Sequence, residues 1–240
     1  MADVIVDMFD ARGGPPTASV DQFNFKQGPT DEGDYVIAWC GVHTSGERPD
    51  WSGIPWGTPL KDDGRQVWVW WPQKVTRKGT RGSSTRHAWV PLIKVSKITR
   101  ARLLDTHFAW YGTRKIPSTW IFNDFGHTTC YMFKDLNDNL KFDPKTEKIH
   151  DELFHPTPDG EAAAAQGFKI TLGDSHGCIH VKPDDIDFMQ KMGYMKKGNL
   201  VHVHKYTERL PPVLKKKGKA PFEIHFYPGA YKILVKGRSK

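Results

Sequence analysis

Short runs of β-branched and aromatic residues, separated by turn formers, recur along the whole chain. Runs of this kind, bounded by glycine, proline, asparagine or aspartate, are typical of β-strands in a half-buried sheet. The pattern predicts strands over residues 33–42, 66–73, 87–98, 118–125, 130–135 and 200–206. We therefore expect a mainly β fold.

Two segments carry helical signals instead. Residues 161–167, EAAAAQG, contain four successive alanines and end in glycine, and residues 183–193, PDDIDFMQKMG, start with proline and acidic side chains. Proline and acidic residues in the first turn and glycine after the last turn favour helices over those bounds. The two predicted helices are short, and they flank a loop that is rich in glycine and histidine.

The C-terminal part of the chain changes character twice. Residues 206–221, YTERLPPVLKKKGKAP, are rich in proline and lysine and predict an extended basic linker. The following FEIHFYPGAYKILVKG returns to strand character around a Pro-Gly turn, which predicts a hairpin. We expect one large domain over residues 1–206, then a basic linker and a C-terminal β-hairpin over residues 207–240 that packs on it.

Composition limits the class of protein. The chain has 240 residues, 38% of them hydrophobic, without an apolar run as long as a membrane-spanning helix, so we expect a substantial core and no membrane partner. The formal net charge of +8 favours an anionic partner. A nucleic-acid-binding motif does not accompany that charge, so nucleic acid is not an expected partner. The N-terminal residues do not show the basic and apolar segments of a signal peptide.

The three cysteines, Cys40, Cys130 and Cys178, are widely spaced. An odd number at such spacing excludes a dense disulfide framework and a paired CxxC zinc site, and it leaves at least one thiol. His202 and His204 alternate with valines in LVHVHKY and should share one face of a strand. A two-histidine metal face is the alternative there, but a third ligand does not stand at a motif spacing. We expect no metal and no other cofactor.

The segment GDSHGCIHVKP places Cys178 between two histidines, His176 and His180. A thiol is a strong nucleophile only as the thiolate, which needs a nearby group that favours loss of its proton. Gly177 allows close approach of the backbone, and the amides of residues 177–179 could point at an oxyanion. A buried structural thiol is the alternative for this cysteine taken alone.

Local spacing does not choose the base for this thiol. Histidines two residues either side of a cysteine share its side of the chain only where the segment is extended. His155 stands 23 residues earlier, after Phe154 at the end of a short apolar run and before a proline-rich turn. The start of a loop after a strand is a common place for catalytic side chains. His150 is a competing base, but it lacks that turn.

These residues carry a resemblance to a known family. FHPTP, followed by GDSHGCIHVKPDDI, resembles the L,D-transpeptidase catalytic domain family, whose signature is a histidine followed at some distance by Ser-x-Gly-Cys. GPTDEGDYVI at residues 28–37 is similar to the family's Pro-Thr-Pro-x-Gly-x-aromatic segment, with Asp31 in place of the second proline. The resemblance covers residues 28–206 in the family's order. It implies a β-sandwich or barrel with short helices beside the active-site loop.

The resemblance also implies catalytic roles for four residues. Cys178 would be the acylated nucleophile, and His155 would be the base that takes its proton. His176 would shape the pocket and orient the acyl chain, while Gly177 and its neighbouring amides would bind the oxyanion.

Three further residues are expected to contact the substrate. Ser175 belongs to the Ser-x-Gly-Cys motif and would shape the pocket. His180 stands where the family generally has arginine or asparagine, a difference that bears on substrate specificity more than on the chemistry. Phe154 directly precedes the expected base.

The implied reaction is acyl transfer on peptidoglycan tetrapeptide stems. The thiolate attacks the carbonyl between the L-centre of diaminopimelate and the terminal D-alanine, and that D-alanine leaves. Transfer of the acyl group to an amine gives a cross-link or D-amino-acid exchange, whereas transfer to water makes the enzyme an L,D-carboxypeptidase. The positive net charge suits an anionic wall substrate.

Two other functions compete with this interpretation. A papain-like peptidoglycan amidase or endopeptidase is disfavoured, because the cysteine of that class normally precedes its histidine. A non-catalytic wall- or polyanion-binding module would bind without turnover. Since the family works in the periplasm or cell wall and a signal peptide is not seen, we hypothesise an antibacterial toxin delivered by a secretion machine such as type VI. A carrier and an immunity protein would then be its partners.

Overall fold

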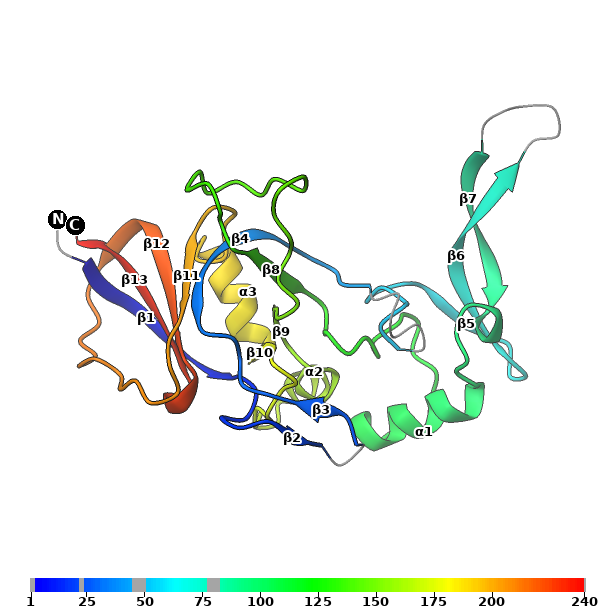
Figure 1. Ribbon diagram of the computed structural model, residues 1–240. Coiled ribbons are helices and arrows are strands. Elements are labelled where there is room, and N and C mark those ends of the chain that lie inside the picture. Colours follow the sequence, from blue (N-terminus) through cyan, green and yellow to red (C-terminus); the bar gives the residue numbers. More distant parts are fainter. Residues whose placement is uncertain (1–2, 22–23, 45–50, 77–82, 240) are drawn as a thin grey trace.

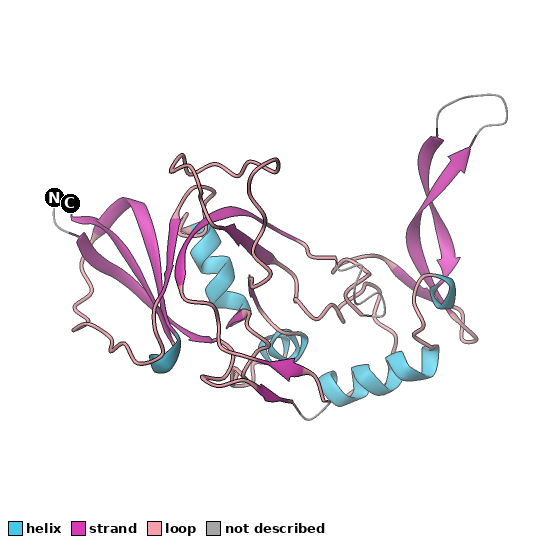
Figure 2. Ribbon diagram, viewed as in Figure 1, coloured by secondary structure: helices cyan, strands magenta, loops and turns pink. Residues whose placement is uncertain are grey.

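The computed structural model describes residues 3–21, 24–44, 51–76 and 83–239 of the chain. The molecule is elongated, with a β-barrel at one end and an arm of strands and one helix at the other (Figure 1). Strands and loops dominate over short helices (Figure 2), so the prediction of a mainly β fold is confirmed. Within the described ranges, the helices are too short or too polar to cross a lipid bilayer.

Eight strands of the described chain close into a barrel in the spatial order β1-β10-β9-β8-β4-β11-β12-β13. Most neighbours are antiparallel, but β9 with β10 and β11 with β12 are parallel pairs. Parallel neighbours need a crossover connection, and helix α2 (Pro158–Ala165) forms part of the one between β9 and β10. The barrel strands are β1 (Asp3–Arg12), β4 (Gly33–Gly41), β8 (Thr129–Phe133), β9 (Phe154–His155), β10 (Ile179–Val181), β11 (Leu200–Val203), β12 (Gly218–Tyr227) and β13 (Lys232–Ser239), and a small separate sheet pairs β2 (Ser19–Val20) with β3 (Lys26–Gln27).

Alternate side chains of the barrel strands point inward and form its core. In β11, Val201 and Val203 are buried inside, and His202 between them lies on the outer face. Large aromatic side chains fill much of the interior, among them Phe154 and Phe226. Burying one large apolar side chain stabilises a fold by about 1.5–3 kcal/mol. Burial of the apolar residues on one face of each strand therefore determines which residues face outward.

The arm lies between β4 and β8 in the sequence and has a hydrophobic core of its own, in which Trp120 and Phe122 are fully buried. Asn123 anchors the chain where it leaves the arm, because its Nδ2 donates to the carbonyls of His43 and Ile54 at 2.9 and 3.0 Å. The elements of the arm are β5 (Leu60–Asp62), β6 (Val67–Thr76), β7 (Ser83–Pro91), the 3-10 helix η1 (Leu92–Lys94) and helix α1 (Arg100–Tyr111).

Two of the predicted strands differ in the structure. The run at 87–98 stops being a strand at Pro91, because Leu92 turns into the arm core through η1. The strand predicted at 118–125 is wrong, since its backbone forms a single β-bridge, between Thr119 and Pro59. Its alternating apolar residues are buried in an irregular segment, a pattern that sequence alone does not distinguish from a strand.

Helix α1 lies outside the predicted elements. Its N-cap is Thr99, whose side chain accepts from the Arg102 amide at 3.2 Å, and it ends at Gly112 in the left-handed conformation. Only Leu103 and His107 of this helix are buried. An apolar stripe of one hydrophobic residue and one histidine is too sparse to show a helical period.

The two predicted helices are confirmed with shifted bounds. α2 begins three residues earlier than expected, because the Thr157 side chain accepts from the Gly160 amide and Pro158 occupies the first turn. α3 (Pro183–Lys191) starts as predicted, with Asp184 and Asp185 in its first turn. Acidic side chains there interact favourably with the helix dipole.

The predicted C-terminal hairpin is present as β12 and β13, joined by the 3-10 turn η2 (Pro228–Ala230). It is part of the barrel rather than an addition to its surface, because β12 pairs with β11 and β13 pairs with β1. The expected domain boundary at residue 206 falls between two barrel strands.

Cys40 of β4 and Cys130 of β8 are cross-strand partners and form a disulfide. The bond joins the two barrel strands from which the arm departs and to which it returns. Cys178 keeps its thiol, so the expectation of at least one thiol is confirmed.

Candidate active site

Cys178 is the residue immediately before β10, and its side chain is half-buried. Ile179 and Val181 of β10 are buried in the barrel core, so His180 between them lies on the outer side of the strand. In the parallel pairing of β9 and β10, His180 is the register partner of His155. The strand pairing therefore brings the cysteine loop and the expected base to neighbouring positions of one sheet.

His155 is buried, with 4% of its surface exposed. Its ring packs against His180 and Phe125, with ring centres 4.9 and 4.7 Å apart. Its Nδ1 lies 2.8 Å from the carbonyl oxygen of Pro156. A carbonyl oxygen only accepts, so Nδ1 carries the proton and donates it to this bond. Nε2 is then the unprotonated nitrogen, which is the form that can take up a proton.

The surroundings keep this imidazole neutral. Burial, followed by the nearby His180 and His43, holds the pKa of His155 well below its ordinary value, and the Pro156 carbonyl opposes this only in part. Burial also lowers the pKa of His180. A neutral imidazole cannot stabilise a thiolate as a cation would before the substrate is attacked, but it can act as a general base. The arrangement therefore suits proton abstraction at the moment of attack.

The loop before Cys178 is held by a buried serine. The Ser175 hydroxyl donates to the Cys178 carbonyl and accepts from the Gly177 amide at 3.0 Å, and the Ser175 amide donates to Gly13 at 3.1 Å. Gly177 has a φ of 133°, which L-residues with a side chain rarely adopt, and a Cβ there would lie 2.5 Å from Glu152 Oε1. Ser175 and Gly177 therefore shape the turn that presents the cysteine.

A second set of hydrogen bonds ties this turn to the N-terminal part of the chain. The Thr30 hydroxyl donates to the Gly177 carbonyl at 2.7 Å and accepts from the Gly14 amide at 3.1 Å. The Thr30 amide donates to Tyr206 Oη at 3.0 Å, and the Tyr206 hydroxyl donates to the Gly14 carbonyl at 2.7 Å. A Cβ on Gly14 would lie 1.7 Å from the Gly28 carbonyl oxygen, so the two segments approach as closely as backbone allows. The segment at 28–37 thus supports the cysteine loop.

The predicted oxyanion amides are in part committed elsewhere. The Gly177 amide donates to Ser175, and the Ile179 amide donates to the Leu153 carbonyl at 2.8 Å. The expectation that both would point at an oxyanion is therefore wrong for this state of the loop. Their bonds serve the turn and the β9–β10 pairing instead.

The remaining predicted residues fall into three environments. Phe154 is fully buried in the barrel core and offers a substrate no surface, contrary to expectation. His176 is exposed, and its Nε2 lies 3.0 Å from a carboxylate oxygen of Asp21. His180 is half-buried, and its Nδ1 donates to the Gly173 carbonyl at 3.0 Å. Of these three, only His180 touches the ring of the expected base.

His43 and Phe125 belong to the site but were not predicted from sequence. Phe125 lies between two imidazoles, with ring centres 3.8 Å from His43 and 4.7 Å from His155. His43 Nδ1 is 2.8 Å from the Tyr131 hydroxyl, and burial lowers the pKa of His43. Both residues are far from His155 in the chain and form no motif with it, so only the fold brings them together.

His127 joins the segment after Phe125 to two helices. Its Nδ1 lies 2.5 Å from Glu161 Oε1 of α2, and its Nε2 lies 2.8 Å from Asp187 Oδ1 of α3. Burial opposes protonation, but the hydrogen bonds and charges of the two carboxylates outweigh it and raise the pKa of His127 to about 9. His127 is therefore a cation at neutral pH that joins a loop to two helices.

His150, the histidine that competed with His155 as the expected base, has other contacts. Its ring packs against Tyr35, with centres 4.7 Å apart, and its Nε2 lies 3.4 Å from Glu152 Oε2. Asp31, His150 and Glu152 form one of two groups of metal-ligand type within the described residues. Glu152 Oε2 already accepts from the Asp31 amide at 2.8 Å, which gives this group a structural use without an ion.

A family model for the L,D-transpeptidase catalytic domain (YkuD) matches residues 14–203. The matched range holds Thr30, His155 and the whole cysteine loop, and it ends with β11, before the last two barrel strands. Searches of the curated proteins and of the solved structures found no match.

Replacing Thr30 with valine tests the support of the cysteine loop. Thr30→Val keeps the shape but leaves the buried Gly14 amide and Gly177 carbonyl without the hydroxyl, so the free energy of unfolding should fall by about 1–3 kcal/mol. Urea unfolding measures the change. Thr30→Ser keeps the hydroxyl and should cost less than half as much. Equal losses in the two variants would contradict the hydrogen-bonding role.

The raised pKa of His127 predicts a pH-dependent stability. A histidine whose folded-state pKa is about 9 stabilises the fold fully below its ordinary value of about 6.5, and this contribution is lost as pH rises through about 9. The melting temperature of the wild type minus that of His127→Gln should therefore shrink between pH 7 and pH 10. Other titrating groups cancel in this difference. A difference that stays flat over that range would show that the ion pairs do not stabilise the folded state.

Proposed function

The chain belongs to the L,D-transpeptidase catalytic domain family, and from that premise we propose that Cys178 is the nucleophile of acyl transfer on peptidoglycan tetrapeptide stems, with His155 as its base. Family membership indicates an enzyme of the L,D-transpeptidase type that acts on peptidoglycan. The observation that carries the residue assignment is the proton position on His155. Its Nδ1–H is held by the Pro156 carbonyl, which leaves Nε2 as a proton acceptor next to the strand that follows Cys178.

The proposed chemistry proceeds through a thioester. As Cys178 Sγ attacks the carbonyl carbon of diaminopimelate, its proton passes to His155 Nε2. The tetrahedral intermediate then collapses, the bond to the D-alanine nitrogen breaks, and that nitrogen takes the proton from His155. An acceptor amine or a water molecule attacks the thioester, His155 accepts its proton, and the cysteine sulfur leaves and is reprotonated. Both acceptors share the first half-reaction, so the products tell transfer from hydrolysis.

A cavity beside the cysteine loop supports an anionic substrate. It has a volume of about 310 Å³ and is lined by the end of β1 and by Leu172 and Lys182, which lie on either side of the cysteine loop and β10 in the chain. Arg12, Lys182 and Lys232 line it, with the two lysines paired to Asp10 and Arg12 paired to Asp174, so three cations meet two carboxylates. The excess of positive charge favours binding of the carboxylates of a stem peptide. We assign substrate binding to this cavity as part of the proposal.

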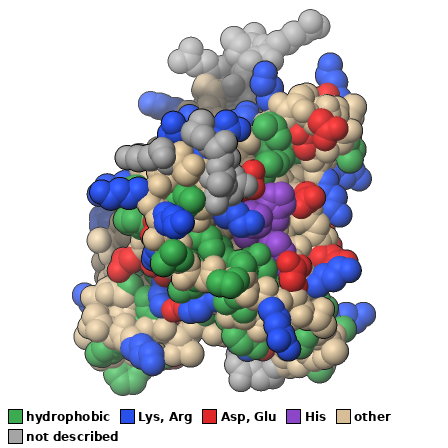
Figure 3. Space-filling model, turned by 90° about the vertical axis from the view of Figure 1, so that its left-hand side faces the viewer, with side chains coloured by type: hydrophobic (Ala, Val, Ile, Leu, Met, Phe, Trp, Pro, Cys, Tyr) green, Lys and Arg blue, Asp and Glu red, His purple; other side chains and the backbone are tan. Residues whose placement is uncertain are grey.

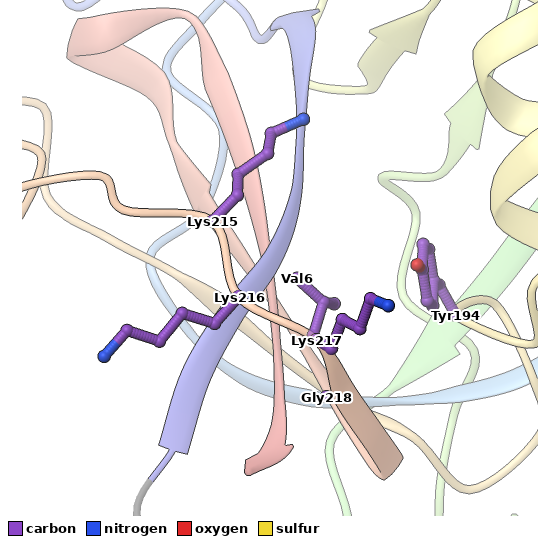
Figure 4. Close-up of a pocket in the computed structure, with 6 residues that line it drawn as sticks. All are labelled: Val6, Tyr194, Lys215, Lys216, Lys217 and Gly218. Carbon is purple, nitrogen blue, oxygen red and sulfur yellow. The ribbon is translucent and has the colours of Figure 1, made fainter. Parts of the chain in front are cut away.

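The two alternative functions have less support. A papain-like amidase would place its cysteine before its histidine, whereas His155 precedes Cys178 here. A polyanion-binding module would draw on the lysine run, where a cavity of about 390 Å³ is lined by Lys215, Lys216 and Lys217 among others (Figure 4). The lysine side chains diverge in that view, and Lys215 pairs with Asp7 at 3.3 Å. Diverging ammonium groups do not build one anion site.

Incubation with tetrapeptide muropeptides, followed by mass spectrometry, tests the proposal. The wild type should release D-alanine and yield dimers, exchange products or tripeptides, and Cys178→Ala should abolish all of them. His155→Gln should slow the reaction by about 10²–10⁴-fold, the usual contribution of a general base. Acylation of the Cys178 thiol by a carbapenem, expected for this family, is a faster check by intact mass.

His150→Gln is the matched control, since His150 was the competing base and its Nε2 lies 3.4 Å from Oε2 of Glu152, a side chain that borders Gly177. Its activity should stay within about threefold of the wild type. Turnover that survives in Cys178→Ala, or that is lost in His150→Gln and kept in His155→Gln, would contradict the assignment of Cys178 as nucleophile and His155 as base.

Action outside the cytoplasm and delivery as a toxin are separate parts of the proposal. The Cys40–Cys130 disulfide supports the first part, because disulfides persist in oxidising compartments such as the periplasm. Delivery by a secretion machine, with a carrier and an immunity protein, stays a hypothesis. Expression in a bacterium with an added periplasmic signal should impair growth, whereas cytoplasmic expression or Cys178→Ala should not. Normal growth with the periplasmic enzyme would contradict a toxin.

A further inference from the structure

Three side chains of metal-ligand type converge on the barrel face opposite the cysteine loop. His202 of β11 is the register partner of His225 of β12, and Glu223 lies two residues before His225 on the same face. One ligand atom from each residue lies within 4.8 Å of the other two. In the closed barrel, β11 and β12 are separated from β9 and β10 by other strands in both directions. The group is therefore distinct from the proposed active site.

Neighbouring side chains fix which nitrogen of His202 is protonated. His202 Nδ1 lies 2.6 Å from Asp34 Oδ1, and a carboxylate only accepts, so Nδ1 carries the proton. The lone pair of the neutral ring is then on Nε2, which lies 3.7 Å from Glu223 Oε2. Metal-binding histidines in proteins characteristically donate their other N–H to a carboxylate in this way.

A chain of two histidines sets the proton of His225. His204 Nδ1 donates to Glu208 Oε1 at 2.9 Å, so Nε2 of the neutral His204 ring is an acceptor. It lies 3.0 Å from His225 Nδ1, which must donate to it. The lone pair of His225 is therefore also on Nε2, and this atom lies 3.5 Å from Glu223 Oε2. Each of the two Nε2 atoms thus lies 3.5–3.7 Å from the same carboxylate oxygen.

This arrangement leaves a buried polar atom unsatisfied. His225 Nε2 is buried and makes no hydrogen bond to any described residue, although 93% of the side chain surface is removed from solvent. The same atom lies 3.5 Å from Glu223 Oε2, and a cation bound between the two groups would satisfy both of them.

We propose that His202 Nε2, His225 Nε2 and Glu223 Oε2 bind a divalent transition-metal ion of the zinc class. Two imidazoles and one carboxylate are a common ligand set for zinc with one position left for water or another ligand. A tetrahedral site with bonds of about 2.0–2.1 Å has edges of about 3.4 Å, close to the 3.5 and 3.7 Å between the Glu223 oxygen and the two nitrogens. The two edges at Glu223 therefore fit a bound ion, whereas the two imidazole rings, stacked with centres 4.5 Å apart and planes at 23°, need to turn toward it.

The surroundings leave the fourth position accessible. A cleft of about 370 Å³ is lined by His202, His204 and His225 together with Asp34 and Glu208. The view onto the barrel in Figure 3 shows histidine side chains gathered at the surface with acidic side chains beside them. Carboxylates outside the ligand set make the cleft attractive to cations, whereas Lys236, the register partner of Glu223, opposes them. The metal would join two parallel strands that belong to the barrel wall.

Titration of the full-length, untagged chain with Zn²⁺ after chelator treatment tests this site. Calorimetry should show one equivalent of Zn²⁺ bound with a dissociation constant on the order of 1 µM or below, and the melting temperature should rise with Zn²⁺. Co²⁺ in its place should give the visible absorption of a tetrahedral site without the charge-transfer band of a thiolate ligand. These readouts do not depend on peptidoglycan turnover, so their outcome is independent of the proposed function.

Variants separate this site from other metal binding. Glu223→Gln removes the ligand charge and should weaken Zn²⁺ binding at least tenfold. Asp34 is largely exposed and therefore tolerant of change. Asp34→Asn should weaken Zn²⁺ binding about 10–100-fold, because it removes the carboxylate that keeps the proton of His202 on Nδ1. His150→Gln, in the other group of ligand type, should bind as the wild type does. Absence of stoichiometric binding to the wild type, binding unchanged in both site variants, or loss in His150→Gln instead would overturn the proposal.

Discussion

The parallel pairing of β9 with β10 is the constraint on which the candidate active site depends. The two strands are short, yet their register sets Phe154 beside Ile179 and His155 beside His180. Phe154 and Ile179 are fully buried in the barrel, and the pleat places the two histidines on the other side. A slip of one residue would exchange the two faces. Hydrophobic burial, rather than attraction between the polar groups, therefore positions the proposed base, His155, next to the cysteine loop.

Neighbouring acceptors decide what each histidine can do. His155 donates one ring N–H to a backbone carbonyl and His202 donates one to a carboxylate, so each keeps a lone pair on the opposite nitrogen. His127 lies between two carboxylates, which favour protonation of both nitrogens and make it a structural cation. The same residue type is thus the proposed base, a ligand of the proposed metal site and an ion-pair partner. At His43, which has no carboxylate partner among the described residues, burial lowers the pKa.

The geometry of the cysteine loop comes from hydrogen bonds within the loop and to the N-terminal part of the chain. The Ser175 hydroxyl hydrogen-bonds to the backbone of the loop, and Gly177 adopts a φ that would be strained in a residue with a side chain. Thr30 and Tyr206 connect that loop to Gly14 from opposite ends of the chain. Ser-x-Gly-Cys is therefore in large part a positioning motif, in which the residues around the cysteine hold its backbone.

The mainly β class, the two helices beside the cysteine loop and the family could all be predicted from the sequence, because alternation, helix signals and short motifs are local properties of the chain. The sequence also singled out Cys178 and His155. The folded chain was needed to show that Phe154 is core, that Phe125 and His43 pack around the proposed base, and that the last hairpin completes the barrel. These outcomes depend on which face each strand turns inward and on contacts between residues distant in sequence, and a linear pattern carries neither. For the same reason His202 showed its metal-ligand partners only once the barrel had placed β12 alongside it.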